Sequence, residues 1–275
     1  MTTTGSDNSA YLSLLLADGR LPTGAHTQSA GLEPALNHGL ELADVPAYVR
    51  ARLTTVTEVE AAAAVVARHR WLLSSDLSDS VVAIATTESD NSAYVGRRLA
   101  EVDRAWRVRT MSAALRDASD LLGRSYLRLA SSVWPRLRLL ATAPRVSDRA
   151  GSSRELDGAV RPPPEPAGSR SSRATWCRAV VLGATAAEAG LDAGQTARLV
   201  GYDDVQTVIA AALKLRPFDP AVGVGWSIAA GAEVEALVSR VARLTEPDQI
   251  PAYAAPQIEH WAELHTRTER RLFRA

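Results

Sequence analysis

Apolar residues recur at spacings of three and four through most of the chain, which is the pattern of helices that bury one face. Alanine is abundant, while phenylalanine occurs only twice and tyrosine six times, and this composition favours helix over strand. We therefore predict an all-α fold, a single-domain helical bundle of about nine or ten helices.

Proline, glycine and capping residues mark the ends of the predicted helices. Pro34 means that the second helix either kinks or starts late, with Pro34 in its first turn. β-Branched residues at 54–57 predict a break in the third helix, and Asp203 or Asp204 is expected to cap the helix that carries Lys214. The predicted helices cover residues 9–19, 27–37, 44–74, 76–87, 93–118, 120–134, 174–189, 192–201, the segment from 203 through Lys214, 221–244 and 257–270.

Two stretches depart from the helical pattern within this single domain of residues 1–275. Residues 145–173 contain the run Pro162-Pro163-Pro164, glycines, serines and many arginines with almost no apolar residues, which predicts a disordered insertion. We assign it no function. Residues 246–275 contain three prolines and a short polar helix, and we expect this tail to become ordered against a partner.

Composition excludes several classes of partner and site. The chain has 31 basic and 31 acidic residues, so it has no net positive charge to attract nucleic acid or an acidic membrane. The single cysteine, Cys177, excludes an internal disulfide and a multi-cysteine zinc or iron–sulfur site. We expect no signal peptide, since the N-terminal residues lack a basic segment ahead of an apolar one, and no run approaches the roughly 18 apolar residues of a spanning helix. The expected compartment is the cytoplasm, with neither nucleic acid nor membrane as a partner.

Motifs for catalysis or metal binding are missing from the sequence. The only close pair of histidines, His260 and His265, is five residues apart, which puts the two rings about 140° apart on a helix. We therefore expect surface histidines and no metal ligands. The chain has neither a phosphate-binding Gly-x-x-x-x-Gly-Lys-Ser/Thr loop nor a Gly-x-Ser-x-Gly elbow. The sequence predicts no catalytic residue and no cofactor bound by this chain.

Three short segments carry candidate interaction chemistry. In residues 21–33, Pro22 and Gly24 predict a sharp turn before a run of polar residues that can cap a helix. On a helical wheel, Lys214 points away from the apolar sector of its helix, so it is not a core residue. Near the C-terminus, Phe273 stands among arginines, and an exposed aromatic beside arginine is a composition enriched at interfaces.

The same three segments resemble the UreF family of urease accessory proteins. The first is Leu-Pro-Thr-Gly-Ala-His-Thr-Gln-Ser-Ala-Gly-Leu-Glu at 21–33, where His26 takes the place of the family's aromatic residue. The second is Ala-Ala-Leu-Lys-Leu-Arg-Pro at 211–217, and the third is Arg-Leu-Phe-Arg-Ala at 271–275. Three blocks in the family's order form a more specific signal than any one of them.

The resemblance implies a non-catalytic scaffold, or chaperone, that forms a homodimer. Such a scaffold bridges UreD (also called UreH) and the GTPase UreG, and modulates GTP-dependent nickel insertion into apo-urease. Ni²⁺, GTP and Mg²⁺ then belong to the partner complex, and residues 271–274 would dock UreD. The residues expected to contact partners are Pro22, Gly24, His26, Ser29, Gly31, Glu33, Lys214, Arg271, Leu272, Phe273 and Arg274.

Two other functions are compatible with the residues alone. An all-helical small-molecule enzyme could form a polar pocket from His26, Glu33 and Lys214. Alternatively, the chain could be an adaptor unrelated to urease.

Overall fold

The computed structural model describes residues 4–81, 88–143, 175–268 and 272–273, and every regular element among them is helical. The all-α prediction is confirmed. The α-helices are α1 (Thr4–Leu16), α2 (Leu32–Asn37), α3 (Val45–Leu53), α4 (Val56–Val81), α5 (Glu88–Arg109), α6 (Ala113–Val133), α7 (Arg138–Thr142), α8 (Arg178–Glu188), α9 (Ala193–Leu215), α10 (Pro220–Val241) and α11 (Pro256–Thr266). Short 3₁₀ turns occupy Ala25–Thr27, Leu42–Asp44, Pro135–Leu137 and Pro247–Gln249.

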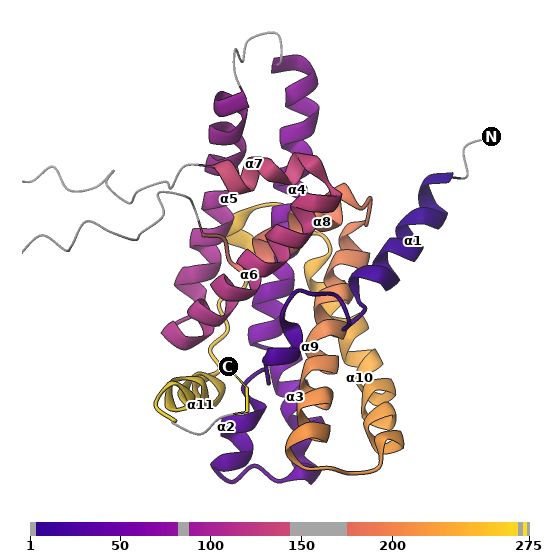
Figure 1. Cartoon of the computed structure of the whole chain (residues 1–275), viewed down its shortest axis with the longest axis vertical. Helices are drawn as coiled ribbons and strands as arrows, with labels where there is room; N and C mark the ends of the chain where they lie inside the picture. The colour runs from indigo at the N-terminus through magenta and orange to yellow at the C-terminus, as the bar shows by residue number, and fades with distance from the viewer. Residues whose placement is uncertain (1–3, 82–87, 144–174, 269–271, 274–275) are drawn as a thin grey trace, which may run out of the picture.

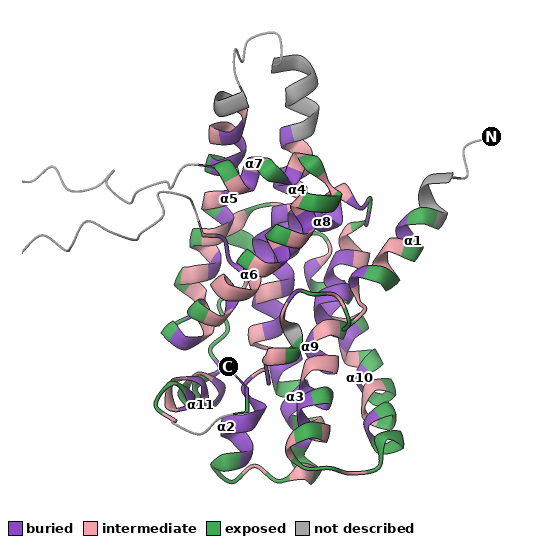
Figure 2. Cartoon of the chain, viewed as in Figure 1, coloured by how far each residue is buried: buried purple, intermediate pink, exposed green. Residues whose placement is uncertain are grey.

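Helix α8 lies at the centre of the bundle, and every residue from Ala179 to Ala187 is buried. It packs against α4 and α6, and α4 in turn packs against α5 and α9 (Figures 1 and 2). Gly183 permits this close approach, since a Cβ atom there would lie 2.2 Å from the carbonyl oxygen of Ala64. Small residues in the middle of α8 therefore let the central helices approach closely.

Several predicted helix boundaries are confirmed. Helix α2 starts at Leu32 with Pro34 in its first turn, so the late start is correct and the helix is not kinked by proline. The chain breaks between α3 and α4 at Thr54 and Thr55, within the predicted range.

Two other predicted boundaries are wrong, and at the first of them a side chain from a distant segment contributes to the helix cap. The break that we placed between 118 and 120 lies at 110–112, where Ser112 accepts a hydrogen bond from the backbone N–H of Leu115 and caps α6. Glu263 of α11 accepts bonds from the Ser112 hydroxyl, at 2.6 Å, and from the Ala114 N–H, at 3.0 Å. The predicted break at 74–76 is absent, since α4 continues to Val81.

Helix α9 is one helix of 23 residues, so the expected cap at Asp203 or Asp204 is wrong. The helix begins after Asp192, which forms a capping box with Gln195. Asp203 and Asp204 instead pair with arginines of other helices. The predicted insertion at 145–173 lies outside the described residues.

Helix α10 passes the length and hydropathy test for a membrane span, contrary to our expectation from the sequence, and 28% of its most apolar window is buried. The segment without charged residues runs from 220 to 232, which is about 20 Å of helix and shorter than the roughly 20 residues that a span requires. A single helix of this kind is weak evidence for a span, so the absence of a membrane partner stays a prediction.

Candidate functional site

The loop between α1 and α2 has the sharp turn that its sequence predicts. Gly24 adopts φ +85°, and its carbonyl oxygen accepts from both the backbone N–H and the hydroxyl of Thr27, at 3.0 and 2.8 Å. Pro22 and His26 are exposed, while Ser29 is fully buried. The backbone N–H of Glu33 donates to the Ser29 hydroxyl at 3.3 Å. The predicted contact residues of this loop thus divide into an exposed and a buried group.

Ala30 and Gly31 enter α2 through two successive left-handed conformations, with φ +52° and +76°. A Cβ atom on Gly31 would lie 2.9 Å from the Tyr48 hydroxyl oxygen, so only glycine fits there without a shift. The carbonyl oxygen of Ala30 accepts from Tyr48 at 2.7 Å and from Arg52 at 2.8 Å. Two side chains of α3 therefore hold the strained entry to α2 in place.

Glu33 is a buried carboxylate that binds the C-terminal tail. Its side chain is 6% exposed, and its two oxygens accept from the backbone N–H groups of Leu272, at 2.7 Å, and Phe273, at 2.8 Å. Charge-assisted bonds of this kind are stronger than neutral ones. One acidic side chain in the first turn of α2 thus joins residues about 240 positions apart in sequence.

Phe273 is 4% exposed, so the expectation of an exposed aromatic at the C-terminus is wrong. The carbonyl oxygen of Phe273 lies 3.1 Å from Nε2 of His265, and the same nitrogen lies 3.7 Å from a carboxylate oxygen of Glu33. His265 is 2% exposed, which contradicts its prediction as a surface histidine. Leu272 is anchored through its backbone N–H but remains 64% exposed.

Lys214 lies on the exposed side of α9, as the helical wheel predicts. Its ammonium nitrogen is 5.4 Å from the centre of the Phe273 ring and 3.4 Å from the carbonyl oxygen of His26. The lysine therefore touches both the N-terminal loop and the C-terminal tail. It is also the only lysine in the sequence, since every other strongly basic residue is an arginine.

These contacts bring the three sequence blocks into one site, which we call the tail-docking site: Ser29, Glu33, Lys214, His265, Leu272 and Phe273. The sequence predicted all of these except His265. The partner of His265 is the backbone carbonyl of Phe273, and a contact with the backbone produces no recognisable spacing in the sequence. Arg271 and Arg274 lie outside the described residues. Partner contact by the predicted residues stays a prediction.

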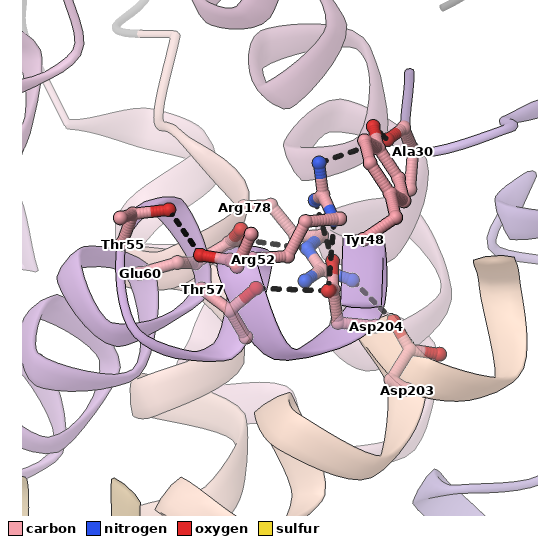
Figure 3. A network of polar contacts seen from close by, with 10 residues as sticks. Ala30, Tyr48, Arg52, Thr55, Thr57, Glu60, Arg178, Asp203 and Asp204 are labelled. Atoms are coloured by element: carbon pink, nitrogen blue, oxygen red, sulfur yellow. Dashed lines mark hydrogen bonds and ion pairs between the residues drawn. The ribbon is translucent and has the colours of Figure 1, made fainter. Parts of the chain in front are cut away.

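A buried ionic network contacts the loop between α1 and α2 through the carbonyl oxygen of Ala30 (Figure 3). Arg52 forms two hydrogen bonds with Asp204, at 2.6 and 3.0 Å, and both side chains are less than 9% exposed. Thr57 donates to the same carboxylate at 2.8 Å. Burial by itself would raise the pKa of Asp204, but the charge and hydrogen bonds of Arg52 outweigh it and lower that pKa below its ordinary value.

A second arginine extends this network to the central helix α8. Arg178 pairs with Glu60 of α4 at 2.6 Å and with Asp203 of α9. The sequence indicated neither arginine, because ion pairs between different helices, here 25 to 152 positions apart, have no local pattern.

A pocket with a volume of about 110 Å³ lies beside this network. Its polar wall includes Arg52, Glu60 and Arg178, and its apolar wall includes Trp106 and Leu115. His26, Glu33 and Lys214 do not line this pocket, so it is not the pocket expected for a small-molecule enzyme.

The described residues contain no group of three or more histidine, cysteine, aspartate or glutamate side chains that could hold a metal ion. Cys177 is fully buried, and burial raises the pKa of its thiol well above the ordinary value. A thiol in that state is a poor nucleophile.

Comparison with known proteins agrees with the three sequence blocks. The family model described as UreF matches residues 41–228. The urease accessory protein UreF of Mycobacterium sp. (strain JLS) is 30% identical over 270 residues, which cover 94% of this chain and 96% of that protein. Proteins of the same name are 40% identical in Mycolicibacterium vanbaalenii and 34% identical in Mycobacterium marinum, each over 124 residues. These two matches span 44% of this chain and about half of each relative, at 48% and 47%. The chain belongs to the UreF family of urease accessory proteins.

Proposed function

We propose that this chain is a non-catalytic scaffold that bridges UreD (UreH) and the GTPase UreG and modulates GTP-dependent nickel insertion into apo-urease. In this proposal the chain acts in the cytoplasm as a homodimer. Ni²⁺, GTP and Mg²⁺ are bound by the partners or pass through the complex. The names of the relatives support the general role, and the tail-docking site supports the specific one.

The observation that carries the proposal is the convergence of the N-terminal loop, Lys214 and the C-terminal tail. The buried Glu33 and Phe273 hold the loop and the tail together, so the exposed residues of both segments form one defined outer surface. That surface presents Pro22, His26, Lys214 and Leu272, which are all exposed. A cation beside an exposed apolar side chain on a fixed backbone is suited to bind another protein.

Affinity capture of the tagged chain with co-expressed UreD and UreG tests the proposal. We expect both partners to co-purify with the wild-type chain. Lys214→Ala and Leu272→Asp should each reduce capture at least tenfold with an unchanged helical circular dichroism spectrum. Val133→Asp is a matched control, because Val133 is 58% exposed on α6, compared with 64% for Leu272.

A cellular assay separates this scaffold from the alternatives. Cells that lack the chain should assemble urease with little nickel, and Lys214→Ala should restore it only in part. Fully metallated urease without the chain, or no capture of either UreD or UreG, would refute the proposal and favour an unrelated adaptor.

A further inference from the structure

The pocket beside the buried ionic network is large enough for a small organic molecule. Its volume is about 110 Å³, whereas a single water needs about 10–15 Å³. It lies between the loop before α2, the end of α5, the first half of α6 and the segment that leads into α11. Tyr253 stands in its wall and is 44% exposed, so the pocket reaches the surface on that side.

One wall of this pocket is apolar. Trp106 and Val59 are buried in the bundle, so their side chains are held in place. The apolar members of the wall are Val56, Val59, Trp106, Leu115, Ala118 and Leu122. Sites for small molecules are lined mostly by such side chains, and a few polar groups among them fix the orientation of the ligand. The apolar part of a ligand would therefore pack against Trp106.

Gln28 gives the pocket a hydrogen-bond donor that the chain does not use. The residue lines the pocket and is 7% exposed, and its side-chain nitrogen Nε2 has no hydrogen-bond partner among the described residues. A buried amide without a partner is unfavourable, and nearly all such groups in folded proteins find one. An acceptor oxygen on a bound ligand would satisfy this nitrogen.

The charged residues of the pocket form a paired and an unpaired set. Three arginines and four carboxylates line it, and five of these seven belong to the ionic network of Figure 3. The other two are Arg109 and Glu259, and neither has an ion pair within the part of the chain that the structure describes. Arg109 donates to the carbonyl oxygens of Ala105, Asp248 and Ile250, which uses three of its five N–H donors. A guanidinium held in this way keeps donors for an anionic group.

An arginine and a carboxylate without counter-ions in one pocket favour a ligand that carries both charges. A ligand with one charge would leave either Arg109 or Glu259 without a counter-ion, whereas a zwitterion pairs with both. We propose that this pocket binds a free amino acid with an apolar side chain. Its carboxylate contacts Arg109 and Gln28, its ammonium group contacts Glu259, and its side chain packs against Trp106. This site is separate from the tail-docking site, and it goes beyond the scaffold function without resting on it.

Isothermal titration calorimetry of the full chain with L-leucine and three analogues tests this site. Isocaproate is leucine without the ammonium group, isoamylamine is leucine without the carboxylate, and glycine lacks the apolar side chain. L-Leucine should bind with a dissociation constant below about 1 mM. Each analogue should bind at least about tenfold more weakly, because each leaves one part of the wall without its partner.

Glu259→Gln keeps the size of the side chain and removes the charge that the ammonium group needs. Affinity for L-leucine should fall at least about tenfold in this variant, while affinity for isocaproate should not fall. Because Glu259 is only partly buried, circular dichroism and melting temperature should not change. Glu233→Gln on α10 is the matched control, since Glu233 is exposed and does not line the pocket, and it should bind L-leucine as the wild-type chain does.

Ala118→Phe locates the binding, because its ring would fill part of the pocket from α6. This variant should lose L-leucine binding with an unchanged circular dichroism spectrum, and if it fails to fold, Glu259→Gln decides. The proposal is overturned if L-leucine does not bind, if any of the three analogues binds as tightly, or if Glu259→Gln keeps wild-type affinity. Wild-type affinity in a folded Ala118→Phe would place the amino acid elsewhere and would also overturn it.

Discussion

Replacement of Glu33 by glutamine should release the C-terminal tail without unfolding the bundle. The carboxylate accepts from the N–H groups of Leu272 and Phe273 at 2.7 and 2.8 Å. Hydrogen bonds to charged groups contribute about 1.5–3 kcal/mol each. Glutamine keeps one neutral oxygen acceptor, and its NH₂ group would face the second backbone N–H, so one bond is lost and the other is weakened.

We expect the docked state of the tail to lose about 2–4 kcal/mol, which lowers the ratio of docked to undocked tail at least about 30-fold. Amide hydrogen exchange at Leu272 and Phe273 measures this ratio directly. Exchange at both amides should accelerate by the same factor. The free energy of unfolding, measured in urea, should change much less, since the central packing of α8 against α4 and α6 does not depend on the tail.

Glu259→Gln is the matched control, because it makes the same change from carboxylate to amide on α11. Among the described contacts, the N–H groups of Leu272 and Phe273 bind Glu33 and not Glu259. It should leave exchange at both tail amides unchanged. Unaltered protection of Leu272 and Phe273 in Glu33→Gln would refute the inference that this carboxylate holds the tail.

Three further substitutions each test a single contact. Asp204→Asn should cost about 3–5 kcal/mol of unfolding free energy, because it leaves Arg52 buried without its anion. The pKa of Asp204 in the folded chain is below its ordinary value of 3.8, so the carboxylate's contribution to stability is complete above pH 3.8 and is lost as the pH falls through the folded pKa. The free energy of unfolding of Asp204→Asn should therefore fall less steeply with decreasing pH in this acid range than that of the wild-type chain. Gly31→Ala should cost about 1–3 kcal/mol in thermal unfolding, since it adds a Cβ 2.9 Å from the Tyr48 hydroxyl at a positive φ. Lys214→Ala should cost less than about 1 kcal/mol, as expected for an exposed cation over a ring, so a large drop in melting temperature would contradict its assignment as a surface residue.

The sequence predicted features that depend on local patterns. Helix periodicity identified the all-α class, and Pro34 marked the first turn of α2, because a proline fixes its own φ and lacks an N–H wherever it stands. The position of Lys214 outside the apolar stripe also followed from spacing along one helix. Each of these features depends only on residues within one helix and not on contacts with other helices.

The features that the sequence could not predict depend on contacts across the fold. Asp204 reads as a helix cap, yet its side chain enters the core because Arg52, 152 positions earlier, neutralises it there. His265 reads as a polar surface residue of a short helix, yet it is buried by the tail that folds back over it. Glu33 stands in the first turn of α2, where an acidic residue also favours the helix dipole, so nothing local showed that its partners are two N–H groups of the tail.

The tail and the loop are coupled through the same small set of contacts. Arg52 binds both the carbonyl of Ala30 and the carboxylate of Asp204, so the entry to α2 is fixed to α9. Further along α9, Lys214 covers Phe273, whose N–H is bound by Glu33 of α2. If a partner removed the tail, the Glu33 carboxylate would lose two donors, and a buried anion without donors is unfavourable. Within the proposed function, a partner that takes up the tail must therefore either bring its own hydrogen-bond donors to Glu33 or admit water there.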